Sequence, residues 1–194
     1  MFVDTLQFLI KTLSGLFVLV LLLRFYLQVA RAPFKHPLCQ FVMAATNFLV
    51  LPTRKLVPSV RNYDTATLLL AWLVCLLANI LRLLLGSLPE VFAFPQVWVS
   101  LFLLSVLEVF KQSLTLLMGA VVVQAVLSWV NPYNPIAPVL DSLTRPFLRP
   151  FRRAVVGGVD LSPLVLLLII QVIMMLPVQA LEAGFLTQLK VVLQ

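Results

Sequence analysis

The sequence predicts an all-α membrane protein with about four transmembrane helices in two parallel tandem repeats, each with a basic amphipathic interfacial segment between its spans. Three observations support this fold class. Of the 194 residues, 62% are apolar and only 11% are charged, whereas a soluble domain has about 45–50% apolar and about 25% charged residues. Long apolar segments recur along the chain, and its two halves resemble each other. This composition leaves too little polar surface to cover a core in water, which excludes a water-soluble enzyme domain.

Four segments are expected to span the bilayer, because each is about as long as the roughly 20 residues that a spanning helix needs. Each is apolar around its whole circumference, as a lipid-facing helix is. Their ranges are 12–29, 65–85, 112–130 and 163–181. A fifth apolar stretch, residues 95–110, is interrupted near its end by Glu108 and Lys111. Three interpretations of it stay open: an interfacial helix, a re-entrant helix, or an overlong start of the third span.

The basic residues predict the orientation of these spans. Nine of the 14 lie in two loops: Arg31, Lys35, Arg54, Lys55 and Arg61 in the first, and Arg145, Arg149, Arg152 and Arg153 in the second. With four spans both loops lie on one side of the membrane, and the positive-inside rule makes that side the cytoplasm. We therefore expect a multi-pass membrane protein with cytoplasmic basic loops and both termini on the opposite side of the membrane.

An internal duplication is visible in the order of the motifs. Residues 51–55 (LPTRK) match residues 149–153 (RPFRR), and an aspartate follows each match before the next span. The matched polar pairs of the first and third spans are Arg24 with Gln28, and Gln124 with Ser128. Both copies run in the same direction through the membrane, so the repeat is parallel. The expected units are residues 1–90 and residues 91–194, the second of which includes the lead-in stretch.

The basic loops predict helices that lie in the membrane interface. In the second copy a helical projection places Phe147 and Phe151 opposite the arginines, and the first copy shows the same division more weakly. Such a helix has its apolar side among acyl chains and its cations among headgroups. Anionic phospholipid is therefore the first expected partner. Prolines at positions 52, 146 and 150 are expected to break each segment into two short pieces.

The basic positions expected to bind lipid or a partner protein are Arg54, Lys55, Arg145, Arg149, Arg152 and Arg153. An acidic protein partner stays open as an alternative to lipid. Nucleic acid is not an expected partner, because no pattern of exposed stacking aromatics accompanies the basic residues.

Polar residues inside or beside the spans form a second set of candidate positions. Arg24, Gln28, Gln124 and Ser128 are expected to form an intramembrane polar seam at which the two halves pack, with an ion path as the alternative. Asp64 and Asp160 stand at the membrane edge, each before the start of a span. Carboxylates are favourable near helix N-termini, so capping or an ion pair with a neighbouring arginine is expected. A cation or proton site is the alternative for these acids.

The sequence offers little catalytic chemistry. His36 is the only histidine, no metal-ligand spacing is present, and the serines lack a partner base. We therefore expect no catalytic residue, no metal site and no cofactor. Cys39 and Cys75 make neither a disulfide framework nor a metal cage, and both are expected to be small apolar packing residues.

The motif order as a whole resembles the YggT family, which comprises small bacterial inner-membrane proteins with relatives in plastids. The resemblance rests on LLLRFYLQ and LPTRKLVPSVRNYD in the first copy, and on LSWVNPYNP, RPFLRPFRRAVVGGVD and LSP in the second. It covers almost the whole chain. The motif positions that it carries over are Arg24, Gln28, Arg54, Lys55, Asp64, Pro146, Arg149, Pro150, Arg152, Arg153, Gly157, Gly158, Asp160 and Ser162.

The resemblance implies a protein without an established enzymatic activity. It links plastid relatives to cytochrome b6f assembly and nucleoid organisation, and Gram-positive relatives to gene clusters with cell-division proteins. It also implies a suggested role in ion uptake or the osmotic response.

Two functions from different classes remain. The first is a membrane scaffold or assembly factor whose basic loops engage anionic lipid and a partner protein. The second is a small ion transporter or channel with its pathway along the polar seam. The scaffold is preferred, because much of the chain is interfacial and no acid is expected inside a span. A homo-oligomer fits either function, and the sequence does not identify the partner.

Overall fold

A computed structural model describes residues 1–33, 36–57, 63–86, 89–131, 134–151, 155–156 and 159–193 of the chain. Its long helices are α1 (Phe2–Val29), α2 (Pro37–Leu56), α3 (Thr65–Gly86), α4 (Pro95–Val130), α5 (Ala137–Leu148), α6 (Ser162–Ile173) and α7 (Gln179–Leu193). The short helical turns are η1 (Pro89–Ala93), η2 (Arg149–Phe151) and η3 (Met174–Val178). Strands β1 (Val155–Val156) and β2 (Val159–Asp160) form a two-residue antiparallel pair.

Within the described residues, four helices are long and apolar enough to cross a membrane. They are α1, α3, α4 and the continuous helix Ser162–Leu189. The predicted fold class is therefore confirmed. The first of these helices starts at Phe2 rather than at residue 12, so it is longer than the sequence indicated.

Residues 95–110 form the first part of α4, which runs without a break for 36 residues. Of the three interpretations, the overlong start of the third span is the one seen. At a rise of about 1.5 Å per residue α4 is roughly 54 Å long, whereas the hydrocarbon core is about 30 Å thick. This helix must therefore tilt steeply or extend beyond the bilayer.

The fourth span passes through Pro177 without ending. Proline has no N–H to donate and its ring crowds the preceding turn. The helix accommodates the proline in η3, one wider π-helical turn that joins α6 to α7. The result is one long helix with a local distortion.

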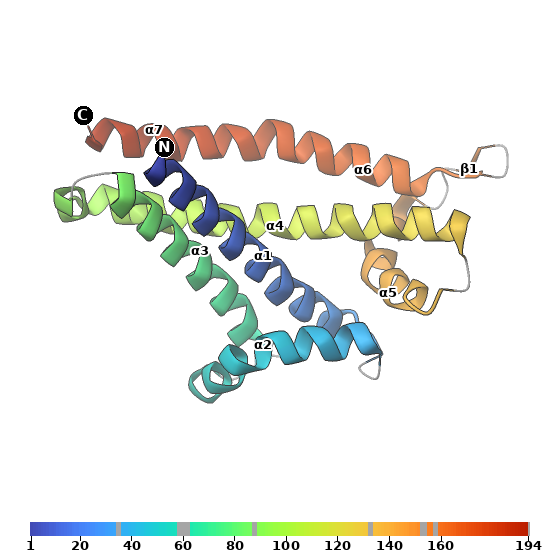
Figure 1. The fold of residues 1–194 in the computed structure, drawn as a ribbon. Helices are drawn as coiled ribbons and strands as arrows, with labels where there is room; N and C mark the ends of the chain where they lie inside the picture. Colours follow the sequence, from blue (N-terminus) through green and yellow to red (C-terminus); the bar gives the residue numbers. More distant parts are fainter. Residues whose placement is uncertain are drawn as a thin grey trace.

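The helices are arranged so that α2 and α5, the two helices predicted to be interfacial, lie at one end of the molecule (Figure 1). Helices α1 and α3 lie side by side and cross α4 obliquely, while α6 and α7 run back along α4. Helix α2 lies across the ends of α1 and α3, and α5 packs beside the end of α4. Both termini lie at the opposite end. This order is the one that a parallel four-span repeat requires.

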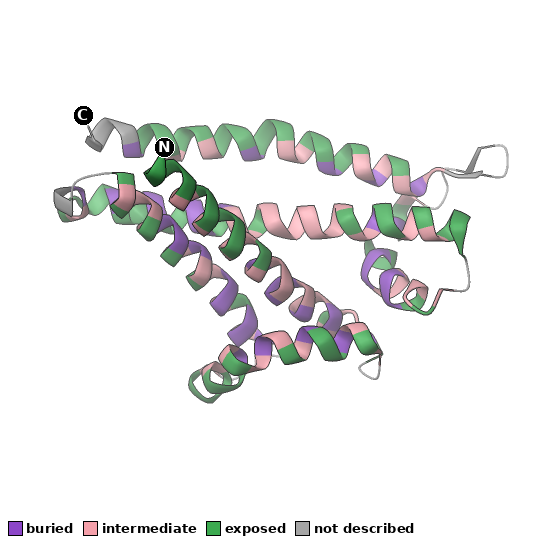
Figure 2. Cartoon of the chain, viewed as in Figure 1, coloured by how far each residue is buried: buried purple, intermediate pink, exposed green. Residues whose placement is uncertain are grey.

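Each half has its own apolar core, and the two cores are built from three helices in corresponding positions. In the first half Leu21 and Leu22 of α1 pack with Val50 of α2 and Ala71 of α3. In the second half the corresponding core joins Val121 of α4, Leu148 of α5, and Leu166 and Ile170 of α6. Figure 2 shows that α6 and α7 are otherwise exposed over much of their length, as lipid-facing helices are.

The predicted breaks at the prolines were wrong for α2 and only partly right for the second copy. Helix α2 is continuous through Pro52, and α5 continues through Pro146 before the chain changes to the 3-10 turn η2 at Arg149. Each proline removes one backbone hydrogen bond but has a φ angle that a helix tolerates. Because Pro52 lies near the C-terminal end of α2, the loss affects only its last turns.

Candidate functional site

Arg24 is a buried cation of the first repeat. Its side chain lies between α1 and α2, and the residue is only 7% exposed. Its Nη1 donates to Thr46 Oγ1 at 2.7 Å and to Asn47 Oδ1 at 2.9 Å. Thr46 in turn donates to the carbonyl of Val42 at 2.6 Å. The guanidinium is thus satisfied by neutral oxygens on α2, which ties the first span to the interfacial helix.

Asp64 links α2 to the start of α3. Arg54 Nε donates to its Oδ1 at 3.2 Å, and Arg54 Nη2 contacts Oδ2 in a salt bridge. The backbone N–H and the hydroxyl of Thr67 also donate to this carboxylate. Burial acts to raise the pKa of Asp64, but the hydrogen bonds from Arg54 and Thr67 outweigh it and hold the pKa below its usual value. Asp64 therefore both caps α3 and forms an ion pair, which are the two roles expected from the sequence.

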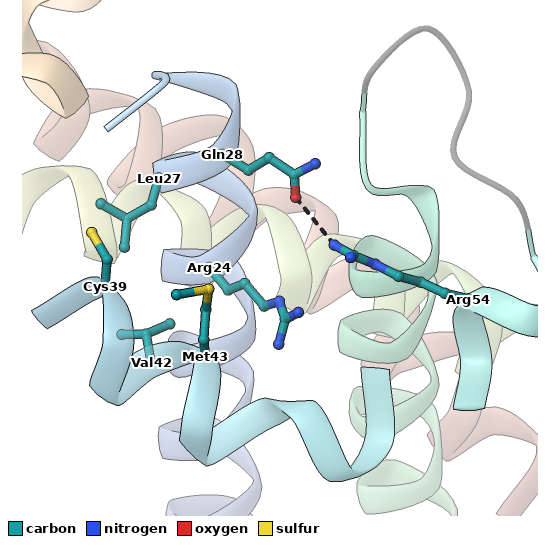
Figure 3. A pocket seen from close by; sticks show the side chains of 7 residues that line it. All are labelled: Arg24, Leu27, Gln28, Cys39, Val42, Met43 and Arg54. Atoms are coloured by element: carbon teal, nitrogen blue, oxygen red, sulfur yellow. Dashed lines mark hydrogen bonds between the residues drawn. The ribbon is translucent and has the colours of Figure 1, made fainter. Parts of the chain in front are cut away.

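A cavity of about 170 Å³ lies between the C-terminal part of α1 and α2, and Arg24, Gln28 and Arg54 are among the residues that line it. In Figure 3 the guanidinium groups of Arg24 and Arg54 lie on the same side of this cavity, and Gln28 reaches toward Arg54. The Gln28 Oε1 atom accepts from Arg54 Nη2 at 3.4 Å. Two arginines and one aspartate give this group a net charge of +1. The structure thus brings together four of the candidate residues of the first copy.

The second repeat builds the same connection with neutral groups. The hydroxyl oxygen of Thr144 on α5 lies within hydrogen-bonding distance of Gln124 Oε1 on α4 and, at 2.9 Å, of the carbonyl of Leu140. Sequence analysis missed both threonines, although each stands eight residues before a matched arginine, Thr46 before Arg54 and Thr144 before Arg152. This repeated spacing was the signal that would have found them.

The expected seam between the two halves is not formed by the polar residues assigned to it. Arg24 bonds to α2 and Gln124 to α5, each within its own repeat. Ser128 is exposed and lines an open cavity of about 550 Å³ beside α5. The reason is that the interfacial helix of each repeat packs on the polar side of the span before it.

The basic positions of the second copy are exposed where the structure describes them. Arg145 and Arg149 lie on the outer side of α5 and η2, and neither forms an ion pair with a described residue. Lys55 is likewise exposed at the end of α2. Arg152 and Arg153 lie outside the described residues, and the side chain of Asp160 is also not described.

A second polar cluster, which sequence analysis missed, lies among the spanning helices; we call it the Glu108 cluster. It consists of Asn79 and Arg82 on α3, Ser105, Glu108 and Lys111 on α4, and Glu182 on α7. Asn79 Nδ2 donates to Glu108 Oε2 at 2.9 Å, and Arg82 Nη1 lies 3.9 Å from Glu108 Oε1. Lys111 Nζ contacts Glu182 Oε2 at 2.6 Å.

This cluster overturns the expectation that no acid lies inside a span. Glu108 and Lys111 were predicted to interrupt the apolar stretch before the third span, but α4 continues through both. A neighbouring cavity of about 150 Å³ is lined by Lys11, Arg82, Glu108 and Lys111 among others. The Nε atom of Arg82 is buried without a hydrogen-bond partner among the described residues. Ionisable groups inside a membrane are costly, so such a cluster is a candidate functional site by default.

The two cysteines and the histidine have structural roles. Cys39 and Cys75 are both free and buried, as expected of apolar packing residues. His36 Nδ1 accepts from the N–H of Leu38 at 3.2 Å and so caps α2. Within the described residues, no group of three His, Cys, Asp or Glu side chains is placed to hold a metal ion.

Comparison with known proteins assigns the chain to a family. The CCB3/YggT family model matches residues 3–85 and 103–181, one segment in each half of the chain. A protein of Vibrio alginolyticus named "Uncharacterized protein in proC 3'region" is 39% identical over 171 residues, which cover 87% of this chain and 90% of that protein. "Uncharacterized protein YggT" of Escherichia coli is 35% identical over 184 residues, or 93% of each chain. No solved structure matches this chain.

Proposed function

The chain belongs to the CCB3/YggT family, and on that premise we propose that it is a non-enzymatic scaffold or assembly factor of the bacterial inner membrane. Its α2–α5 end binds anionic phospholipid and a partner protein. The basic loops face the cytoplasm and both termini face the periplasm, following the positive-inside rule. The proposal concerns this end because the described basic positions of both repeats, Arg54, Lys55, Arg145 and Arg149, lie on α2, α5 and η2.

The observation that carries the proposal is one buried apolar cluster that α1, α2 and α5 share. Cys39 and Val42 of α2 share one buried apolar cluster with Val139 and Leu143 of α5 and with Leu27 of α1. Two helices that are far apart in the sequence are thus joined through α1, which supports one common surface rather than two separate loops. A single fixed surface is what a scaffold needs in order to hold a partner in a defined orientation.

The outward side of α2 supports an interfacial position. Phe41, Phe48 and Leu51 are exposed, whereas Val42 and Val50 are buried against the spans. Aromatic and aliphatic side chains on the free side of an interfacial helix fit among acyl chains. Basic side chains near an anionic leaflet contribute about 1 kcal/mol each to membrane attraction. An acidic surface on a membrane or cytoplasmic protein would complement the same cations.

The test is purification in a mild detergent, with co-purifying proteins identified and the mass of the complex measured. The native chain is compared with a variant in which Arg145 and Arg149 are changed to Gln, and with a matched variant in which both are changed to Lys. A stoichiometric partner that is lost in the Gln variant and retained in the Lys variant supports the scaffold. A homo-oligomer without any partner, equal in all three proteins, contradicts it.

A second candidate function is a small ion transporter, which the Glu108 cluster favours. Its cavity is lined by charged groups from α1, α3 and α4, and parallel repeats occur in transporters. The scaffold is preferred because these charges are paired, Arg82 with Glu108 and Lys111 with Glu182. Such pairs hold α3, α4 and α7 together. Ion flux into proteoliposomes that is abolished by Glu108→Gln would favour the transporter instead.

A further inference from the structure

An apolar cavity lies between the two repeats, where α1 meets α4 and α5. It has a volume of about 290 Å³ and is lined almost entirely by apolar atoms, with Tyr26, Phe110, Leu117 and Ala120 among its walls. Apolar cavities of about half this size bind a benzene molecule and stay free of water. The cavity therefore fits part of a hydrocarbon chain.

A basic groove adjoins this cavity on the side of α5. Ala30 and Pro146 line both hollows, so the groove and the cavity meet at these two residues. The groove has a volume of about 850 Å³ and contains the side chains of Arg145 and Arg149, which are one helical turn apart. Together the two hollows have an apolar part and a cationic part in contact with each other.

The net charge of the groove suits a ligand with one negative charge. Arg145 and Arg149 are exposed there without an ion pair among the described residues. Asp141 is the acid among the residues that line the groove. The three side chains give a net charge of +1, which one phosphodiester neutralises. Guanidinium groups bind phosphate oxygens through paired hydrogen bonds.

We propose that this junction is a binding site for one anionic phospholipid. Its phosphate lies on Arg145 and Arg149, and one acyl chain enters the cavity between α1, α4 and α5. The proposal rests on the proposed function in one respect, because it names the lipid at the α2–α5 end of the scaffold. It differs from general attraction to an anionic leaflet, since it requires one lipid at one place. A lipid bound there would fill the space between the two repeats and stabilise their relative orientation.

The experiment measures lipid bound per chain by native mass spectrometry after purification in a mild detergent. Delipidated protein is titrated with phosphatidylglycerol, and with phosphatidylcholine of the same chain length as the zwitterionic comparison. The native chain is expected to retain one phosphatidylglycerol and to show a higher unfolding temperature with it than with phosphatidylcholine. A variant with Arg145→Gln and Arg149→Gln is expected to bind phosphatidylglycerol about 30-fold more weakly.

The cavity is tested separately with Ala120→Phe, which adds bulk to its wall and leaves the arginines in place. The matched control is Val126→Phe on the same helix, where the side chain is exposed. The proposal expects Ala120→Phe to lose the retained lipid and Val126→Phe to keep it. Both variants must elute as the native chain does in size-exclusion chromatography; Ala120→Val is the milder replacement if Ala120→Phe does not fold, and it is expected to weaken lipid retention.

Three results would overturn the site. Lipid retention that falls in the arginine variant but not in the Ala120 variants would show surface adsorption only. Retention that no variant changes would show bulk lipid around the protein, and equal binding of phosphatidylcholine would exclude recognition of the negative charge. The proposed function fails separately, because a chain that holds the lipid but captures no partner protein retains the site and loses the scaffold.

Discussion

Replacing Asp64 by Asn tests whether the buried ion pair at the start of α3 stabilises the first repeat. Asp64 is 1% exposed and accepts hydrogen bonds from Arg54 and Thr67. Hydrogen bonds to charged groups contribute about 1.5–3 kcal/mol, but the side chain of Arg54 is 38% exposed and solvent screens part of its charge. Asn is also a good N-cap, so the cap of α3 is retained. We therefore expect Asp64→Asn to lower the free energy of unfolding by about 1–2 kcal/mol.

The dependence on pH has a definite sign. The pKa of Asp64 is held below its usual value of 3.8 in the folded protein. A depressed pKa contributes stability above the unfolded value, and this stability is lost as the pH falls through the folded value. The native chain should therefore lose its advantage over Asp64→Asn as the pH falls below about 4, and the two stability curves should converge there.

The assay is unfolding in detergent micelles, followed by circular dichroism, for the native chain, Asp64→Asn, Arg54→Gln and the double variant. The two single changes should be non-additive, because each removes the same contact. Asp4→Asn is the control, since Asp4 pairs with the N-terminal amine and its side chain is 80% exposed. Additive single changes, or an Asp64→Asn protein with native stability and the native response to acid, would refute this reasoning.

Three further predictions follow from other contacts. Thr46→Ala should lower the free energy of unfolding by about 1–3 kcal/mol. The loss should exceed that of Thr144→Ala, because Thr46 is an acceptor for buried Arg24 whereas Thr144 bonds to a neutral amide. Equal losses of the two variants in thermal unfolding would contradict this. Glu182→Gln should lower the free energy of unfolding by about 1–3 kcal/mol, because it leaves Lys111 unpaired. Lys111→Met in the same chain should recover most of this loss. A double variant that is no more stable than the single one would count against the pairing. Neither cysteine should react with a maleimide in the folded protein, since Cys39 is 2% and Cys75 5% exposed and burial also raises the pKa of the Cys39 thiol. Labelling in denaturing detergent is the comparison. Rapid labelling of Cys39 in the folded protein would show that α2 detaches from the spans.

Much of the architecture could be predicted from the sequence because it depends on local quantities. Length and apolar composition located the four spans, since any segment of that kind must satisfy its backbone hydrogen bonds as a helix in lipid. The matched motifs located the repeat, which the two segments of the family model also cover. The role of Asp64 followed in the same way, because an acid just before a helix is close to its first N–H groups whatever the rest of the fold does.

The tertiary structure alone decided which residues each polar group meets. Nothing local to Arg24 or Gln124 indicates that they bond to threonines on α2 and α5 rather than to each other; this depends on the angle at which each interfacial helix crosses the preceding span. The Glu108 cluster depends in the same way on residues of α3, α4 and α7 that lie up to 103 positions apart (79 to 182). The sequence by itself thus determined the number of spanning helices, through their length and hydrophobicity, but not where each helix begins or whether it continues through its prolines. Their packing determined the candidate sites, because a buried charge takes its partners from the helices that lie within hydrogen-bonding distance.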